Sequence, residues 1–170
     1  EDSYWQIIEE SLRNSKHQQE QEQFLIEYLQ NLDLAEIIGF RLRTDKLLYD
    51  TYNSEMWCAG FIMNWGCSDD GFEYFRNWVI SQGKAIYYNA LQNPDSLVDA
   101  IDGTLELYYF EEFWYVALEA FRNKTGQDLF DFVEGESPDY PLFDFTWDEN
   151  NLESMVAICP RLYSKVGHFK

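Results

Sequence analysis

Residues 56–83 read MWCAGFIMNWGCSDDGFEYFRNWVISQG, and this stretch decides the fold. Its first part, residues 56–65, is apolar almost all round, which is typical of a helix buried on every side at the centre of a domain. Asn64 within it must find hydrogen-bond partners, because an unpaired buried amide costs about 1–3 kcal/mol. GCSDDG then predicts a turn, and Asp70 with Glu73 has the spacing of a capping pair that opens a second helix.

Helix signals recur on both sides of this stretch. Apolar side chains repeat at helical spacing over residues 17–31 and again over 109–124. Three residues mark predicted helix ends. Gly83 is expected to end the helix after GCSDDG in the left-handed conformation. Gly126 is expected to end the helix over residues 109–124, and Pro160 to end the last helix. Further helix starts are predicted from capping pairs and from an asparagine before a proline, namely Ser3 with Gln6, Asp33 with Glu36, Thr146 with Glu149, and Asn93 with Pro94.

Between residues 127 and 145 the helical pattern disappears. The segment EGESPDYPLFDF, residues 134–145, contains glycine, two prolines and alternating rings, which predicts an ordered but irregular loop. No internal repeat, low-complexity linker or break in composition divides the chain. We therefore predict an all-α fold, a single compact multi-helix domain over residues 1–170 with a central apolar helix and an irregular aromatic and acidic loop near the C-terminus.

The composition is rich in rings and in acids. Aromatic residues make up 18% of the chain, and most are expected to pack in the core, because each ring buries a large area. Acidic residues outnumber basic ones 31 to 12, which gives a formal net charge of -19. Nucleic acids and anionic membrane surfaces are bound through Lys and Arg, so neither is an expected partner. An acidic surface favours association with a basic protein face, although it also simply keeps a protein soluble.

The cysteines and the apolar segments indicate a compartment. Cys58, Cys67 and Cys159 cannot all pair with one another, and no C-x-x-C motif occurs. This pattern is typical of reduced thiols and predicts a cytoplasmic protein. No segment approaches the roughly 20 apolar residues of a membrane span, and the first residues lack the basic and apolar regions of a signal peptide.

Residues 66–83, GCSDDGFEYFRNWVISQG, resemble the signature of an uncharacterised bacterial family, a domain of unknown function sometimes linked loosely to a regulator of molybdenum metabolism. The resemblance covers nearly the whole chain and implies an all-helical single domain, but it implies no activity. Asn64-Trp65 before Gly66 departs from the small-residue lead-in of that family. The other stretches that resemble it are YWQIIEES at 4–11, Met56-Trp57 with Ala59, NPDSL at 93–97, NLE at 151–153 and CPRL at 159–162.

The strongest candidate site begins at the GCSDDG turn, where three acids and an arginine lie within two turns of one predicted helix. The helix dipole stabilises acids at this end, so the carboxylates would act as caps with the arginine as their countercharge. Alternatively, the same side chains and two tryptophan walls form a polar notch beside the central helix that binds a partner or a small ligand. Paired carboxylates there would serve acid–base chemistry if burial raised the pKa of one. The predicted binding residues are Trp65, Asp69, Asp70, Glu73, Arg76 and Trp78.

The residue spacing gives less support to two other candidate sites. Asp139, Asp144, Asp148 and Glu149 cluster around the irregular loop, and calcium takes several oxygen ligands. Their spacing does not match an EF-hand loop, so a solvated acidic loop is favoured. Cys67 would be a nucleophile only beside a base, and the adjacent acids are expected to raise its pKa.

No cofactor or metal is predicted. His17 and His168 lie at opposite ends of the chain, and the cysteines show no zinc spacing. Glycine-rich phosphate loops, the G-x-S-x-G motif and the H-E-x-x-H motif do not occur.

Three functional hypotheses remain. The leading one is a non-enzymatic interaction protein, regulatory or similar to an immunity protein or an antitoxin, whose acidic and aromatic face binds a basic protein partner. The alternative is an enzyme or small-ligand binder that uses the notch between Asp69 and Arg76. The third is a structural module whose acidic surface serves solubility alone.

Overall fold

The computed structural model of the chain describes residues 2–133 and 139–166, and these residues form helices and no β-strand. The predicted all-α fold is therefore confirmed. Within this part of the chain, no helix combines the length and the apolar character needed to cross a bilayer. The elements in chain order are α1 (Asp2–Asn14), α2 (Gln18–Leu29), α3 (Leu34–Asp50), α4 (Ser54–Asn64), α5 (Asp69–Ser81), α6 (Lys84–Gln92), the 3-10 helices η1 (Pro94–Ala100) and η2 (Glu111–Tyr115), α7 (Val116–Thr125), the 3-10 helix η3 (Leu129–Phe132), α8 (Leu152–Ile158) and α9 (Pro160–Val166).

Helix α4 is buried on almost every side, as its apolar sequence predicted, and Met56 is completely inaccessible to solvent. Asn64 at its end finds the partners that its burial demands. Its Nδ2 donates to the Gly60 carbonyl at 3.0 Å, and its Oδ1 accepts the Tyr108 N–H at 2.7 Å. The amide therefore ties the central helix to the chain that leads into η2.

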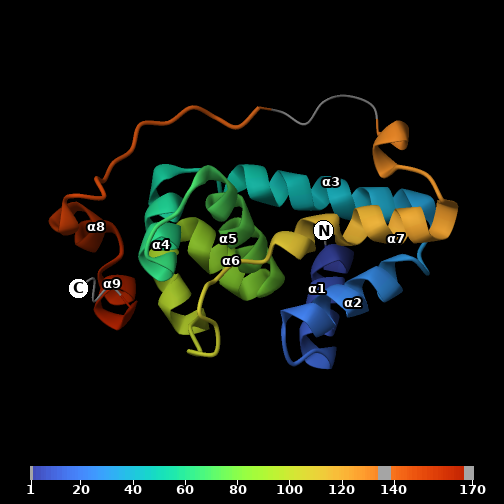
Figure 1. The fold of residues 1–170 in the computed structure, drawn as a ribbon, viewed down its shortest axis with the longest axis horizontal. Coiled ribbons are helices and arrows are strands. Elements are labelled where there is room, and N and C mark those ends of the chain that lie inside the picture. Colours follow the sequence, from blue (N-terminus) through green and yellow to red (C-terminus); the bar gives the residue numbers. More distant parts are fainter. Residues whose placement is uncertain (1, 134–138, 167–170) are drawn as a thin grey trace.

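The helices enclose one continuous aromatic core. Figure 1 shows α3 and α7 side by side along one edge, with α1 and α2 beneath them and α4, α5 and α6 grouped beside them. Most of the largest fully buried side chains are rings, which agrees with the expectation that the aromatic residues pack in the core. The fully buried rings are Trp5, Phe72, Phe75, Trp78, Tyr87, Phe110, Phe113 and Phe121.

Residues 139–147 are here called the strap. They comprise the described part of the predicted segment 134–145 and the two residues after it, and residues 134–138 lie outside the described residues. The strap runs along the outside of α3 and α4 toward α8 (Figure 1). Its Tyr140 ring stacks on Tyr52 with centroids 4.2 Å apart, and Thr146 donates its N–H to Ser54 Oγ at 2.8 Å. The prediction of an ordered, irregular and ring-rich segment is confirmed for these residues.

Several predicted helix boundaries are confirmed. Asp33 and Glu36 form a reciprocal capping box at the start of α3, in which each side chain accepts the backbone N–H of the other residue. Asn93 accepts the Asp95 N–H and opens η1, with proline at the first position. Gly126 ends α7 in the left-handed conformation, with φ at 72°.

Three predicted starts were wrong. Helix α1 already includes Ser3, so this residue is not a cap. Helix α5 is capped by Ser68, whose Oγ accepts the Gly71 N–H at 3.1 Å, and not by Asp70 with Glu73. The Ser68 hydroxyl occupies the Gly71 N–H, so the helix begins at Asp69, and Asp69 and Asp70 lie in its first turn. Helix α8 is capped by Asn151 and not by Thr146, because Thr146 is bound to α4.

The predicted conformation of Gly83 and the extent of two predicted helices were also wrong. Gly83 has φ 95° and ψ 171°, outside the left-handed helical region, and it serves as the residue before α6. The helix through Leu152, Met155 and Val156 ends before Pro160, as predicted, but it is not the last helix. Pro160 itself begins α9, because the first turn of a helix needs no N–H from its first residue. The predicted helix over 109–124 begins as η2, and the Phe110 N–H bonds to the Tyr74 carbonyl at 2.9 Å.

Candidate functional site

The six residues of the predicted notch do not line one surface. Trp65 is 62% exposed and ends α4 in the left-handed conformation, whereas Trp78 is 1% exposed and lies in the core. The two tryptophans therefore cannot be walls of one notch. Asp69 and Asp70 are exposed in the first turn of α5, and Glu73 is half-buried one turn later.

Arg76 is buried and points into the molecule. Its Nη1 donates to the Leu48 carbonyl at 2.6 Å, and its Nε donates to the Phe72 carbonyl at 3.2 Å. The guanidinium carbon lies 4.9 Å from the ring centroid of Tyr52 and 4.7 Å from that of Tyr140. Arg76 therefore joins α5 to the end of α3 and to the strap.

The expected role of Arg76 as a countercharge was wrong. It forms no ion pair with Asp69, Asp70 or Glu73, all of which the structure describes. The spacing placed the four side chains on adjacent positions of one helix, but the space between α5 and α3 offers the guanidinium carbonyl acceptors and ring faces. Contacts from α3 and the strap, which are distant in the sequence, direct the side chain inward.

A second arginine, Arg41, is also removed from the surface. Its Nε and Nη2 donate to the two carboxylate oxygens of Asp45 at 3.1 and 2.6 Å, and its Nη1 donates to the Trp114 carbonyl at 2.8 Å. The guanidinium carbon lies 3.6 Å from the Trp114 ring centroid. Burial raises the pKa of the Asp45 carboxyl, and the charge of Arg41 opposes this shift. This pair joins α3 to η2 and contributes no basic surface.

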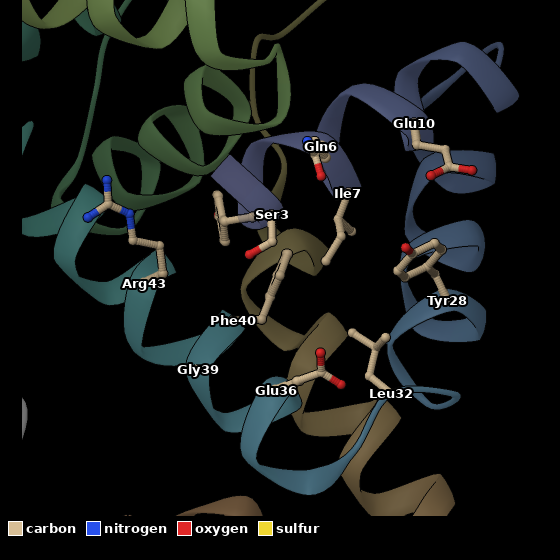
Figure 2. A pocket seen from close by; sticks show the side chains of 11 residues that line it. Ser3, Gln6, Ile7, Glu10, Tyr28, Leu32, Glu36, Gly39, Phe40 and Arg43 are labelled. Carbon is tan, nitrogen blue, oxygen red and sulfur yellow. The ribbon is translucent and has the colours of Figure 1, made fainter. Parts of the chain in front are cut away.

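An open groove lies between α1, α2 and α3, and Figure 2 shows it from close by. Its volume is about 490 Å3. Figure 2 shows Tyr28 and Leu32 facing Ile7 and Phe40 across the gap. The groove is lined by Ser3, Tyr4, Gln6, Ile7, Glu10, Tyr28, Leu32, Glu36, Gly39, Phe40 and Arg43.

The groove has an apolar floor and acidic sides. Ile7 and Phe40 are buried at its base, while the carboxylates of Glu10 and Glu36 lie on opposite sides (Figure 2). Gly39 leaves the backbone of α3 uncovered, since within the described part of the chain no atom beyond its own helical turn and chain neighbours lies within 4 Å of where its Cβ would be. Sequence reasoning missed this site, although a glycine in the middle of an apolar helical repeat was a signal for it.

A second hollow, here called the aromatic pocket, lies beside the GCSDDG turn. Its volume is about 320 Å3. The walls come from α4, from the turn through Cys67, and from the strap and the two acids that follow it. The lining residues are Trp57, Phe61, Cys67, Phe145, Trp147, Asp148 and Glu149.

The acids around the irregular loop do not gather into a metal site within residues 2–133 and 139–166. No group of three or more His, Cys, Asp or Glu side chains there is arranged to hold an ion. Asp148 instead closes a local turn, because its Oδ1 accepts the Asn150 N–H at 2.8 Å. His168 lies outside the described residues.

The Cys67 thiol is poorly suited to act as a nucleophile. Burial raises its pKa to about 12, and the charge of Asp69 adds to this shift while Arg76 opposes it. The sequence predicted the direction of the shift, but its main cause is loss of solvent and not the neighbouring acids. All three cysteines are free thiols, with Cys58 and Cys159 fully buried.

We expect iodoacetamide to alkylate Cys67 very slowly in the folded protein at pH 8. With a pKa of about 12, roughly one thiol in ten thousand is ionised at that pH, and the thiolate is the reactive species. Peptide mapping by mass spectrometry measures the rate, which should rise about tenfold per pH unit while the fold persists. All three cysteines should react rapidly in guanidinium. Rapid labelling of folded Cys67 at pH 8 would contradict the assigned pKa.

Comparison with known proteins identifies a family but no relative of established activity. The family whose sequence model matches residues 1–123 has the description "Protein of unknown function (DUF4240)". No curated protein and no solved structure matches the chain. The match confirms the expected uncharacterised family, although it ends before residues 151–153 and 159–162, where the resemblance was also expected.

Proposed function

The chain belongs to the DUF4240 family, whose description assigns no activity. From its surface we propose that it is a cytoplasmic interaction protein. We propose further that it binds a basic protein partner in the groove between α1, α2 and α3. The observation that supports this most directly is the open apolar floor between two carboxylates. A regulator or an immunity-like protein that covers a basic effector would work in this way.

The shape of the groove favours one helix of a partner. Grooves between helices bind amphipathic helices through apolar anchors spaced three or four residues apart. The floor formed by Ile7, Leu32 and Phe40 would receive such anchors, and the missing side chain at Gly39 would allow close approach to α3. A volume of about 490 Å3 accommodates two or three large side chains.

The charge of the chain favours a basic partner. Glu10 and Glu36 flank the floor, so Lys or Arg beside the apolar anchors would meet carboxylates. The formal net charge of -19 would accelerate the encounter with such a partner and would repel acidic competitors. Arg43, at one end of the groove, donates Nη2 to the Tyr88 hydroxyl at 3.1 Å.

The alternative of an enzyme or small-ligand binder at Asp69, Asp70, Glu73 and Arg76 has no observation in its favour. Arg76 is bound to carbonyls inside the molecule, and the acids lie near the exposed start of α5. The proposed function therefore does not use these residues.

We expect Gly39→Leu to abolish partner binding without weakening the fold. The new side chain would enter the groove, where no described residue outside its own helical turn occupies the space beside Gly39. Leucine is also a better helix former than glycine. Capture of partners from the source cell at low and at moderate salt, followed by titration of the captured protein, measures the effect. The control is Ala85→Leu, which adds leucine at an exposed position on α6.

Charge removal tests the same groove. Glu10→Gln with Glu36→Gln should weaken binding and reduce its dependence on salt, and glutamine preserves the capping box at Asp33. The matched control is Glu119→Gln with Glu153→Gln, which makes the same charge change at exposed positions elsewhere. A partner bound equally well by the groove variants, or no salt-sensitive partner at all, would refute the proposal.

A further inference from the structure

The rings of the aromatic pocket line one hollow and are steeply inclined to one another. Phe145 is nearly perpendicular to Trp57, with centroids 5.3 Å apart and an angle of 77°. It is also perpendicular to Trp147, with centroids 5.6 Å apart and an angle of 89°. Phe61 lies 5.1 Å from Trp147 at 56° and completes the wall. All four rings line the same hollow, so an occupant would contact ring surface on several sides.

Hydrogen bonds hold the two indoles in place. Trp57 donates Nε1 to the Cys67 carbonyl at 3.2 Å, and Trp147 donates Nε1 to the Ser54 carbonyl at 2.9 Å. Thr146 beside Trp147 is tied to Ser54 Oγ as well. The rings are therefore positioned before any ligand arrives, and both indole N–H groups are already used.

The charge at the pocket is negative. Asp148 and Glu149 line it together with the rings, and among the described residues no basic side chain lines it. Asp148 Oδ1 already accepts a hydrogen bond from the Asn150 N–H, which directs that carboxylate into the local turn. Glu149 is exposed and supplies a second negative charge at the same end.

We propose that the aromatic pocket binds a small quaternary ammonium compound. Ring faces attract cations, and several rings around one space are the common way of binding alkylated ammonium groups. An anion would meet two carboxylates and no free indole donor. A bare ammonium ion would lose water without enough acceptors to replace it, whereas an alkylated nitrogen has no N–H to satisfy. The volume of about 320 Å3 is that of a small-molecule site.

Choline and its neutral carbon isostere, 3,3-dimethylbutan-1-ol, test the proposal, because they share a shape and differ in charge. Each is titrated into the full chain at constant ionic strength, and the indole N–H resonances of Trp57 and Trp147 are followed by NMR. We expect saturable shifts with choline and an affinity at least about tenfold higher than for the isostere. Equal affinities, or no saturable shift with choline, would overturn the proposal.

Variants then assign the binding to the rings and to the charge. Phe145→Ala should weaken choline binding about tenfold, and Phe145→Tyr should restore it, since the ring contributes its face. Leu142→Ala is the matched control, because Leu142 is fully exposed on the strap and does not line the pocket. Glu149→Gln should weaken binding severalfold, while Glu153→Gln should not. Equal losses in Phe145→Ala and Leu142→Ala would refute the assignment.

A peptide that carries trimethyllysine distinguishes the source of the ammonium group. We expect it to bind no more tightly than choline, because the proposal places the whole recognition within the pocket. A peptide that binds more tightly than choline and more tightly than its unmodified form would overturn the small-molecule assignment.

Discussion

Replacing Arg76 with alanine is expected to lower the free energy of unfolding by about 3–4 kcal/mol. The side chain is 1% exposed, and its guanidinium bonds to the Leu48 and Phe72 carbonyls. Alanine would lose both charge-assisted hydrogen bonds and the contacts with Tyr52 and Tyr140, and would leave a cavity between α5, α3 and the strap. Urea unfolding followed by circular dichroism measures the change.

Two further variants separate packing from charge. Arg122→Ala on the exposed face of α7 should change stability by less than about 0.5 kcal/mol. Arg76→Met should recover part of the loss, because methionine fills the space without a buried charge. If Arg76→Ala cost no more than Arg122→Ala, the guanidinium would have to lie in solvent, contrary to the structure.

Trp78→Ala is expected to cost about 3–5 kcal/mol, as is usual for removal of a buried ring. Trp78 is 1% exposed and packs edge-on against Tyr108, with centroids 5.0 Å apart. Trp65→Ala is the matched control, since that indole is 62% exposed, and it should cost less than about 1 kcal/mol. The midpoints of thermal unfolding of the two variants are compared, and the variant with the lower midpoint has lost the tryptophan that belongs to the core.

Trp78→Phe should cost much less than Trp78→Ala. The Trp78 Nε1 is buried and finds no acceptor among the described residues, so phenylalanine keeps most of the packing and removes an unsatisfied donor. Small losses of similar size in Trp65→Ala and Trp78→Ala would instead support the predicted pairing of these residues at a binding surface.

The residue pattern predicted those features that depend on neighbours within about four positions. Periodicity located the helices, and the nearly continuous apolar character of residues 56–65 identified the buried α4. The capping box of Asp33 with Glu36 and the terminal Gly126 were also readable, because caps bond to N–H and carbonyl groups of the adjacent turn. The expected burial of Asn64 required hydrogen-bond partners, and the Gly60 carbonyl and the Tyr108 N–H supply them.

Tertiary packing decided everything that depends on distant partners. Trp65 and Trp78 are equally apolar in the sequence, and only the neighbours around each one make the first exposed and the second buried. Arg76 turns inward because Leu48 offers it a carbonyl from 28 positions away. The groove is formed by three helices, and the aromatic pocket is formed by α4 together with residues 145–149, which lie about 80 positions further along the chain. Helical propensity and capping act along a few residues, whereas a cavity is shaped by surfaces that meet only after the chain has folded.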